Sequence, residues 1–360
     1  AMSADIIVIG GGIAGISAAA RLSNDARVTV LEAETALGYH ASGRSAALFE
    51  ENYGAPSVQA LNRASRTFLE EENGGYLTPR GLLLLARAHE REAFEADMVA
   101  MHLTEISVVD AQQCTLIVDP ATVTHAAYHE DALDIDTDRV IHDFARTVRA
   151  NGGRVITGQP VQQIARQGAQ WAITTKSDAF LCKTIVNAAG AWADEIATLA
   201  GVRTIGLTPC RRSVARVPAP AGHDVSNWPI FFGVGESWYA KPDAGALLVS
   251  PADEDPTTPH DAYADDFVLA EGIARFEAHV TTTVTRMLSN WAGLRTFSPD
   301  RTLVLGRAAD APEFVWCAGQ GGYGFQSSPA ASQLLADLVL GRTPALDAET
   351  VAALRPERFS

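Results

Sequence analysis

The N-terminal segment restricts the fold more than any other part of the chain, because a glycine-rich turn lies there between two kinds of apolar pattern. Residues 5–9 form a short β-type apolar run, and the alanine-rich stretch 13–22 has helical character. A second apolar run, 27–31, follows shortly after it. This order predicts a strand, a tight turn, a helix and a second strand, the βαβ unit that binds dinucleotides.

The turn has the spacing Gly10-x-Gly12-x-x-Gly15. Gly10 permits the tight turn, Gly12 lets the backbone approach a pyrophosphate, and Gly15 lets the helix pack on the strand. The N-terminus of the helix adds positive partial charge. Glu32 stands 22 residues after Gly10 and is expected to accept hydrogen bonds from the ribose hydroxyls. Taken alone, the pattern fits NAD as well as FAD.

A second segment of the same spacing, Gly319-x-Gly321-x-x-Gly324, precedes a C-terminal helical stretch at 328–340. No strand and no ribose-binding acid follow that stretch, so it does not predict a second dinucleotide site. Glycines that open a helix let the backbone approach a planar ligand, and the helix dipole would stabilise negative charge on a reduced flavin ring. Without a second βαβ unit, the electrons are expected to come from a small substrate.

The rest of the chain predicts a mixed architecture. A chain of 360 residues exceeds the usual size of one hydrophobic core, so two domains are expected. Residues 136–150 have one apolar helical face, and short strands follow between 154 and 186. Residues 206–294 alternate like an antiparallel sheet with a helical stretch at 268–287, and the run 82–85 is predicted to be a strand.

Charge and composition disfavour several classes of function. The net charge of -15 at pH 7 disfavours nucleic acid and anionic membranes as partners, and no apolar run approaches the roughly 18 residues of a membrane span. The four cysteines form no CxxC pair, and the N-terminus lacks the pattern of a signal peptide, so a cytoplasmic location is expected. His125 and His129 stand four residues apart, but their surroundings predict a strand without a third ligand, so no metal site is expected.

Five segments occur in a specific order along nearly the whole chain: Gly10–Gly15, Gly38–Ser45, Val186–Trp192, Trp291–Arg295 and Gly321–Gly324. Together they resemble the D-amino-acid oxidase-like family of FAD-dependent oxidoreductases, which includes glycine oxidase and D-amino-acid dehydrogenases. The resemblance is closest to D-arginine dehydrogenase-like members, which have counterparts of the run 211–213 and of the segment 239–242.

The resemblance implies an α/β fold with one FAD. A Rossmann-like FAD-binding domain would be built from the discontinuous segments 1–50, 133–205 and 296–360, and an α+β substrate-binding domain with an antiparallel sheet from 51–132 and 206–295. Sarcosine-oxidase-like relatives bond a cysteine ahead of the C-terminal glycines to the flavin. The stretch from Leu294 to Arg307 has no cysteine, so the FAD is expected to be non-covalent.

The same resemblance implies which residues contact the cofactor. Ser42, Arg44 and Ser45 would contact the flavin or its pyrophosphate, Val161 the adenine, and Gly190 would pack on the cofactor. The planar fork of Arg44 suits phosphate, and a surface ion pair is the alternative. The other expected neighbours of FAD, beyond the N-terminal glycines and Glu32, are Ile13, Ala14, Ala33, Gly43, Ala47, Ala189, Trp192, Gly293, Arg295, Gly321, Gly322, Tyr323, Gly324 and Gln326.

A carboxylate held over a flavin needs a fixed cation, and Arg is suited to this because its fork binds both oxygens. By the resemblance, Arg212 and Arg295 would bind the substrate carboxylate, and the hydroxyls of Tyr53 and Tyr239 would assist. Gln326 is also expected at the substrate.

Two leucines indicate the nature of the substrate side chain. Leu82 and Leu48 stand where the arginine-specific enzymes have an acid and a histidine, which indicates a more apolar side chain, because a buried cation without a partner is costly. Glu50 could restore a negative charge there, although a solvated position is the more favoured interpretation for a glutamate.

We therefore expect oxidative deamination of a free amino acid, D-configured and with an apolar or medium-sized side chain. Hydride transfer from the α-carbon to flavin N5 requires orientation, so no acid or base is assigned. The imino acid would hydrolyse to a 2-oxo acid and ammonia. The alternatives are oxidation of an N-methyl amino acid or a 2-hydroxy acid, a flavin-binding subunit of a larger oxidase, and an NAD-dependent dehydrogenase. The sequence leaves the electron acceptor open among a quinone, another carrier and oxygen.

Overall fold

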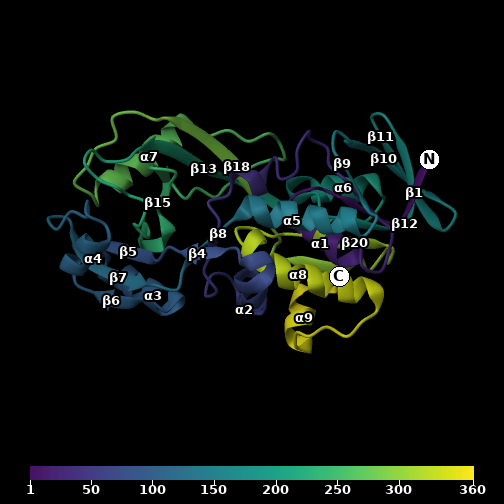
Figure 1. Cartoon of the computed structure of the whole chain (residues 1–360), viewed down its shortest axis with the longest axis horizontal. Helices are drawn as coiled ribbons and strands as arrows, with labels where there is room; N and C mark the ends of the chain where they lie inside the picture. Colours follow the sequence, from purple (N-terminus) through teal and green to yellow (C-terminus); the bar gives the residue numbers. More distant parts are fainter.

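The computed structural model describes residues 1–360 and contains two large sheets that lie next to each other along the longest axis of the molecule (Figure 1). The sheet that begins with the N-terminal strand lies at one end, and the sheet built mostly from the middle of the chain lies at the other. A small three-stranded sheet joins segments between them.

The first sheet has the order β10-β11-β12-β1-β2-β9, and β20 also pairs with β12. The pairs of β1 with β2 and β12, of β2 with β9 and of β12 with β20 are parallel. The strands are β1 Met2–Ile9, β2 Val28–Leu31, β9 Arg154–Ile156, β10 Val161–Gln167, β11 Gln170–Thr175, β12 Ala179–Asn187, β19 Val304–Arg307 and β20 Phe314–Ala318.

Three helices pack together on this sheet: α1 Ile13–Leu22, α5 Thr137–Ala150 and α8 Gly324–Leu340. The predicted βαβ unit is confirmed by β1, α1 and β2. The apolar face predicted for α5 is buried in the core with residues of α1 and α8. Because parallel strands end at a common edge, the loops after β1, β2 and β12 meet there. Ligands of open α/β sheets bind at this edge.

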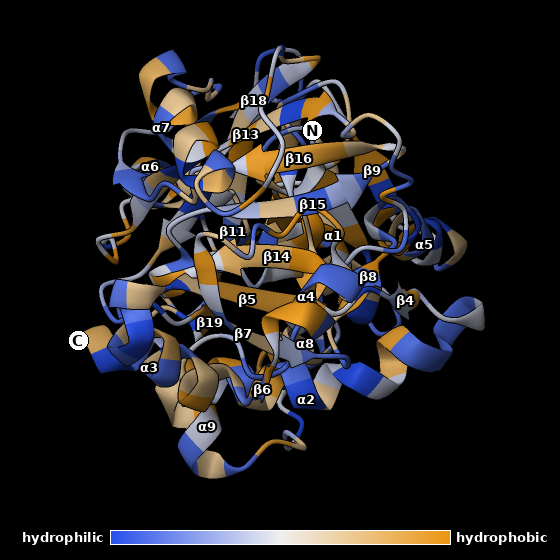
Figure 2. Ribbon diagram, turned by 90° about the vertical axis from the view of Figure 1, so that its left-hand side faces the viewer, coloured by the Kyte–Doolittle hydropathy of each residue, from blue (hydrophilic) through white to orange (hydrophobic).

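The second sheet has the order β17-β13-β16-β15-β14-β5-β7-β6, and β18 also pairs with β13. Its pairs are antiparallel except β14 with β5. Figure 2 shows β14 and β5 as apolar strands in the middle of this sheet. The strands are β5 Leu82–Arg87, β6 Thr104–Ile106, β7 Val123–His129, β13 Thr208–Pro218, β14 Ile230–Gly233, β15 Tyr239–Asp243, β16 Ala246–Ser250, β17 Asp255–Pro256 and β18 Ser289–Phe297.

The remaining elements surround these sheets. The small sheet contains β3 Leu48–Phe49, β4 Leu77–Pro79 and β8 Leu133–Ile135. The further helices are α2 Pro56–Glu71, α3 Arg91–Met101, α4 Val108–Cys114, α6 Ala193–Leu199, α7 Asp266–Glu277 and α9 Ala348–Leu354. The 3-10 turns are η1 Ala41–Arg44, η2 Glu72–Gly74, η3 Ala88–Glu90, η4 Gly190–Trp192, η5 Val234–Glu236 and η6 Pro356–Phe359. No helix combines the length and the apolar character that crossing a bilayer requires.

Helix α2 packs with the first sheet and its helices. Helix α2 lies in the expected substrate-binding segment, yet it packs against α8 and α9, and its buried residues join the core of the first sheet. The core of the first sheet therefore includes residues from this helix as well as from the N-terminal and C-terminal segments.

Two helices differ from the predicted limits. The helical stretch predicted at 268–287 ends at Glu277, because the β-branched run from Thr281 to Thr285 disfavours a helix. Helix α8 begins at Gly324 and continues through Pro329. Proline has no N–H to donate, and the hydroxyl of Ser328 donates instead to the carbonyl of Phe325 at 2.8 Å.

Candidate functional site

One elongated cavity connects the carboxyl edge of the first sheet with the inner face of the second, and its volume is about 440 Å³. Residues of the N-terminal glycine turn line it together with the arginines of β13 and β18 and the glycines before α8. A ligand in this cavity would therefore contact both sheets.

The cavity begins at the N-terminus of α1, where two glycines are required by close backbone packing. Gly10 has φ +114°, and a Cβ placed on it would lie 2.1 Å from the carbonyl oxygen of Ala188. A Cβ on Gly15 would lie 1.8 Å from the carbonyl oxygen of Gly10. On Gly12 the nearest atom would be the hydroxyl oxygen of Ser42, at 3.1 Å. The turn thus packs tightly behind α1 and leaves its helix end facing the cavity.

Two side chains organise this end of the cavity. The carboxylate of Glu32 accepts hydrogen bonds from the backbone N–H of Gly11 at 2.9 Å and of Glu34 at 2.7 Å. Each oxygen keeps a further lone pair for a ligand hydroxyl. The hydroxyl oxygen of Ser42 accepts the N–H of Ile13 at 3.0 Å, so the turn η1 lies against the N-terminus of α1. The other free N–H groups of that first turn remain for an anionic group.

Arg44 lines the cavity, but its guanidinium is engaged elsewhere. It donates to the carbonyl oxygens of Tyr39, Ala262 and Ala292 at 3.0–3.2 Å and forms an ion pair with Asp261 at 2.8 Å. Four of its five N–H groups are used by these contacts. This arrangement matches the ion-pair alternative and joins η1 to the loop before α7. One N–H group of Arg44 is left for the expected contact with the flavin or its pyrophosphate.

At the other end of the cavity lie Arg212 on β13 and Arg295 on β18. The two strands are paired antiparallel, with Cys210 opposite Arg295 and Gly293 opposite Arg212. Residues that face each other or stand two apart share one face of a sheet, so both arginines project from the same face. The Nη1 atom of each is buried and makes no hydrogen bond within the protein.

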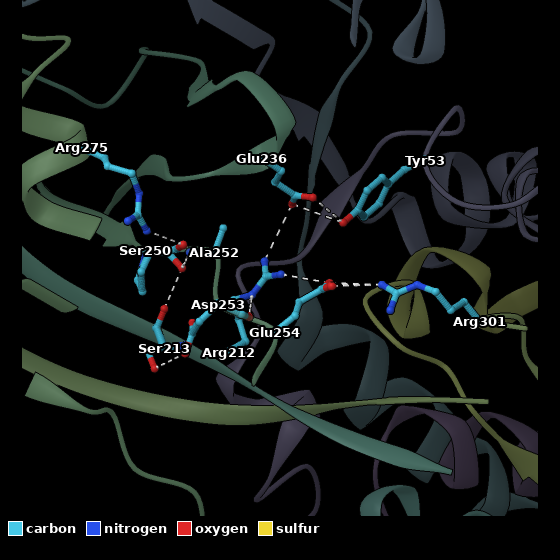
Figure 3. A network of polar contacts seen from close by, with 11 residues as sticks. Tyr53, Arg212, Ser213, Glu236, Ser250, Ala252, Asp253, Glu254, Arg275 and Arg301 are labelled. Atoms are coloured by element: carbon cyan, nitrogen blue, oxygen red, sulfur yellow. Dashed lines mark hydrogen bonds and ion pairs between the residues drawn. The ribbon is translucent and has the colours of Figure 1, made fainter. Parts of the chain in front are cut away.

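Both guanidiniums are held in place by their surroundings. The Nε atom of Arg212 donates to the carbonyl oxygen of Asp253 at 2.9 Å, and the carboxylate of Glu236 lies 3.8 Å from Nη1 (Figure 3). Burial disfavours the charged form of Arg295, but Tyr53, Tyr239 and Glu236 outweigh this and raise its pKa above the ordinary value. Two cations, each with a buried Nη1 group that makes no hydrogen bond, form a site for an anionic group with two oxygens.

The two tyrosines expected beside the substrate occupy different positions. Tyr239 lines the cavity, with the guanidinium of Arg212 5.9 Å from the centre of its ring. Tyr53 does not line it; its hydroxyl donates to Glu236 at 3.0 Å, and its ring packs edge-on against Tyr323 at 5.2 Å. Burial and Glu236 raise the pKa of Tyr53, so its hydroxyl stays a neutral donor.

The structure brings most of the expected residues together at this cavity. Those that line it are Gly10, Gly12, Ile13, Ala14, Glu32, Ala33, Ser42, Arg44, Ser45, Ala47, Leu48, Val161, Ala189, Gly190, Trp192, Arg212, Tyr239, Gly293, Arg295, Gly321, Gly322, Gly324 and Gln326. Those that do not are Gly15, Gly43, Tyr53, Leu82 and Tyr323. Leu82 is 4% exposed and belongs to a buried apolar cluster against which Leu48 packs.

Glu50 is not solvated, contrary to the interpretation favoured from the sequence. It is 3% exposed, and its Oε2 atom lies 3.3 Å from Nε2 of His129 on β7. Burial raises the pKa of Glu50, while His129 acts in the opposite direction. Its backbone N–H donates to the side-chain oxygen of Gln326 at 2.9 Å, but Glu50 does not line the cavity.

Two acids near the arginines were not found from the sequence. Glu236 ends the turn η5 with φ +52°, and Glu254 lies in the loop between β16 and β17. Neither stands at a recognisable spacing from Arg212, because the strands that bring them together pair only in the folded chain. The one local signal in the sequence was the neighbouring Gly235, which is typical of a turn.

The residues present suit FAD. The glycine turn, the helix end and Glu32 match the needs of a pyrophosphate and a ribose, and one continuous cavity leads from them to the glycines before α8. At that point a Cβ on Gly322 would lie 2.7 Å from Nη1 of Arg295, so the backbone passes directly beside the arginine pair.

The model of the family described as DAO, FAD dependent oxidoreductase, matches residues 5–338. A hydrogen cyanide synthase subunit HcnC of Pseudomonas aeruginosa is 26% identical over 290 residues, which cover 76% of this chain and 66% of the relative. The chain thus spans less than two thirds of the length of this relative.

Solved structures of the same fold cover both chains almost completely. Glycine oxidase from Geobacillus kaustophilus superposes with a TM-score of 0.83 and 20% identity, covering 98% of each chain. The L-alpha-glycerophosphate oxidase from Mycoplasma pneumoniae, solved with FAD bound, also has a TM-score of 0.83 and 20% identity, covering 94% of this chain and 95% of that one.

Proposed function

Because the chain belongs to the DAO family of FAD-dependent oxidoreductases, whose model spans residues 5–338, we propose that it oxidises the carbon–nitrogen bond of a free amino acid. The single observation that carries this proposal is the arginine pair. Arg212 and Arg295 project from one face of β13 and β18 into the cavity, and each has a buried Nη1 atom without a hydrogen bond. A substrate carboxylate would satisfy both atoms at once.

In this proposal the chain binds and orients the substrate. The arginines hold the carboxylate, and Tyr239 and Leu48 border the space in which the rest of the substrate lies. FAD, when bound, supplies the atom that accepts a hydride from the α-carbon, which is flavin N5. No acid or base is needed for a substrate bound with a neutral amine, and the imino acid hydrolyses afterwards to a 2-oxo acid and ammonia.

The proposed substrate is a D-amino acid with an apolar or medium-sized side chain. Leu48 lines the cavity and packs against the apolar cluster that contains Leu82, so this wall offers no partner for a guanidinium. Glu50 is buried with His129 outside the cavity lining and therefore supplies no counter-charge. The D configuration follows from the resemblance to D-amino-acid dehydrogenases alone.

We also propose that the FAD is bound without a covalent bond. The cysteine nearest to the C-terminal glycines is Cys317, and burial raises the pKa of its thiol to about 12. A thiol that stays protonated is a poor nucleophile. Heat or acid should therefore release all of the yellow colour into the filtrate.

A panel of candidate substrates tests the proposed reaction. The purified yellow protein would be mixed anaerobically with D-amino and L-amino acids, sarcosine and 2-hydroxy acids, and flavin bleaching would be followed at 450 nm. Bleaching by D-amino acids with apolar side chains is expected. Bleaching by sarcosine or a hydroxy acid alone would instead establish one of the two related activities.

The arginine pair is tested by a matched substitution on one strand. Arg212→Lys should lower kcat/KM about 100-fold, because a lysine cannot bind both carboxylate oxygens. Arg216→Lys changes the same residue type on β13 but affects a half-exposed ion pair with Asp243, and it should leave kcat/KM within about twofold.

A second candidate is a flavin-binding subunit of a larger oxidase, and the relative that is a hydrogen cyanide synthase subunit favours it. An isolated chain that binds FAD but is not bleached by any member of the panel, and that is bleached after addition of a partner from its own source, would support this candidate.

A further inference from the structure

A single carboxylate links the substrate arginine of β13 to Arg301 in the loop between β18 and β19. Glu254 lies in the loop between β16 and β17, and its Oε1 atom is 3.4 Å from Nη2 of Arg212. The same carboxylate receives Nη2 of Arg301 at 3.3 Å on Oε1 and at 3.1 Å on Oε2. Figure 3 shows Glu254 between the two guanidiniums.

These contacts determine which donor of Arg212 is left for a ligand. Nε donates to the carbonyl oxygen of Asp253, and Nη2 donates to Glu254. A guanidinium is planar, so holding two of its three nitrogens fixes the direction of the third. The third, Nη1, is buried without a hydrogen bond and lies 3.8 Å from the carboxylate of Glu236, too far for a hydrogen bond.

The loop that carries Glu254 is itself held firmly against β13. Both carboxylate oxygens of Asp253 accept hydrogen bonds from Ser213, at 2.6 Å from its N–H and 2.7 Å from its hydroxyl. The hydroxyl of Ser250 donates to the carbonyl oxygen of Ser213 at 2.7 Å. Glu254 therefore extends from a fixed backbone.

On its other side Glu254 reaches the segment that leads to the C-terminal glycines. Arg301 has φ +62°, and its guanidinium lies 3.8 Å from the centre of the Phe297 ring. A Cβ on Gly321 would meet that ring at 2.5 Å, so Phe297 packs directly on the glycine segment that lines the cavity. Arg212, Glu254, Arg301 and Phe297 thus form a continuous series of contacts from β13 to Gly321.

We propose that Glu254 is a positioning residue that bridges Arg212 and Arg301 and thereby fixes the plane of the Arg212 guanidinium, so that its Nη1 group is available to the substrate carboxylate. This inference rests on the proposed function, in which the arginine pair binds a carboxylate. Glu254 itself touches neither substrate nor cofactor in this role.

Positioning and simple charge make opposite predictions for the removal of Glu254. A carboxylate beside a cation weakens the attraction of that cation for a second anion, so loss of its charge alone would tighten the binding of a carboxylate ligand. Loss of a positioning contact would let the Arg212 fork rotate and would weaken binding. The sign of the change therefore separates the two roles.

The test uses the FAD-loaded protein and benzoate as the probe, with binding followed through the flavin absorption spectrum. Glu254→Ala is expected to raise the Kd of benzoate about 10-fold. Glu254→Gln keeps an oxygen acceptor at the same place and should raise it less, about 2-fold to 3-fold. The control is Glu105→Ala. Glu105 lies on the outer strand β6 and forms an exposed ion pair with Arg91 of α3, so its loss should leave the Kd of benzoate unchanged.

Kinetics give a second readout. Glu254→Ala should raise the KM for the amino acid by a factor similar to the rise in Kd, while the limiting rate of flavin reduction stays within about twofold of the wild type. An unchanged or lower Kd for benzoate in Glu254→Ala would overturn the inference.

The failure of the proposed function has a different signature. If no amino acid bleaches the wild-type flavin and benzoate does not bind to it, the arginine pair is not a carboxylate site and the proposed function falls. If the wild type reduces its flavin and binds benzoate while Glu254→Ala behaves identically, the positioning role alone is wrong.

Discussion

The two glycine segments of this protein have the same spacing and opposite environments. In the first, Gly10–Gly15, the glycines at both ends pack backbone against backbone, and added Cβ atoms would meet carbonyl oxygens at 2.1 and 1.8 Å. In the second, Gly319–Gly324, added Cβ atoms at positions 321 and 322 would meet the side chains of Phe297 and Arg295, at 2.5 and 2.7 Å. One segment is built into the fold, and the other packs against side chains at the proposed substrate site.

The difference shows why an identical spacing carries two meanings. In the first segment the glycines let β1, α1 and β12 approach one another, so a side chain there would disturb the sheet itself. In the second, Gly321 makes room for the ring of Phe297 and Gly322 for the guanidinium of Arg295. Substitutions in the first segment should therefore affect folding and FAD, and substitutions in the second should affect the substrate.

The largest expected effect is at the third glycine of each segment. Gly15→Ala places a Cβ against the carbonyl oxygen of Gly10 and should destabilise the fold by about 3 kcal/mol, the upper range of overpacking. In Gly324→Ala the nearest contact of the added Cβ is the Cγ2 atom of Ile13 at 3.3 Å, so the loss of folding stability should stay below about 1 kcal/mol. Thermal unfolding measures the stability of both variants, and the ratio of absorbance at 450 and 280 nm measures their FAD content. Equal losses would remove the distinction between the segments.

Gly322→Ala sharpens the contrast, because its Cβ would press on Nη1 of Arg295 rather than on backbone. The arginine can move, so the protein should keep its FAD while the KM for the amino acid rises about 10-fold, equivalent to about 1.4 kcal/mol. Steady-state kinetics and FAD content are the two measurements. Loss of FAD with an unchanged KM would place Gly322 with the nucleotide instead.

Gly12→Ala should give the reverse pattern with a smaller amplitude. The added Cβ lies 3.1 Å from the hydroxyl oxygen of Ser42 at the end of α1, so the Kd of FAD for the apoprotein should rise about 5-fold, or about 1 kcal/mol. The KM for the substrate should not change once the protein is loaded. A raised KM in the loaded protein would show that the two ends of the cavity are not independent.

A last effect, as small as that of Gly12→Ala, concerns Glu50, whose backbone N–H donates to Gln326 of α8 behind the second segment. Burial raises the pKa of Glu50 in the folded protein, so its charge costs stability once the pH exceeds the ordinary pKa of a glutamate, and costs nothing below it. Glu50→Gln should therefore stabilise the protein by about 1 kcal/mol near pH 7 and by nothing near pH 3. Unfolding by urea at both pH values checks this, and a loss of stability at pH 7 would show that the pair with His129 is favourable.

The sequence predicted the elements that depend on local patterns. The strand, turn and helix from Asp5 to Leu22 and the amphipathic α5 follow from periodicity and glycine spacing, and the strand that carries His125 and His129 follows from the β-branched and aromatic residues around them. The structure confirms all of these elements. The predicted length of α7 was wrong, because a run of β-branched residues was included in it. The start of α8 was predicted too late, at Ser328, because a proline at position 329 usually marks the beginning of a helix. The sequence does not show that the hydroxyl of Ser328 replaces the N–H that Pro329 lacks.

The candidate site divides in the same way. The sequence by itself determined the nucleotide end, because Gly10, Gly12, Gly15 and Glu32 act within one βαβ unit whose geometry is set by neighbours along the chain. The tertiary structure alone decided the state of the charged residues. Arg44 is held by Asp261, Glu50 is buried against His129, and Glu254 joins Arg212 to Arg301. These partners come together only when distant strands pair and exclude water, and burial and charge depend on what surrounds a side chain rather than on the residues beside it.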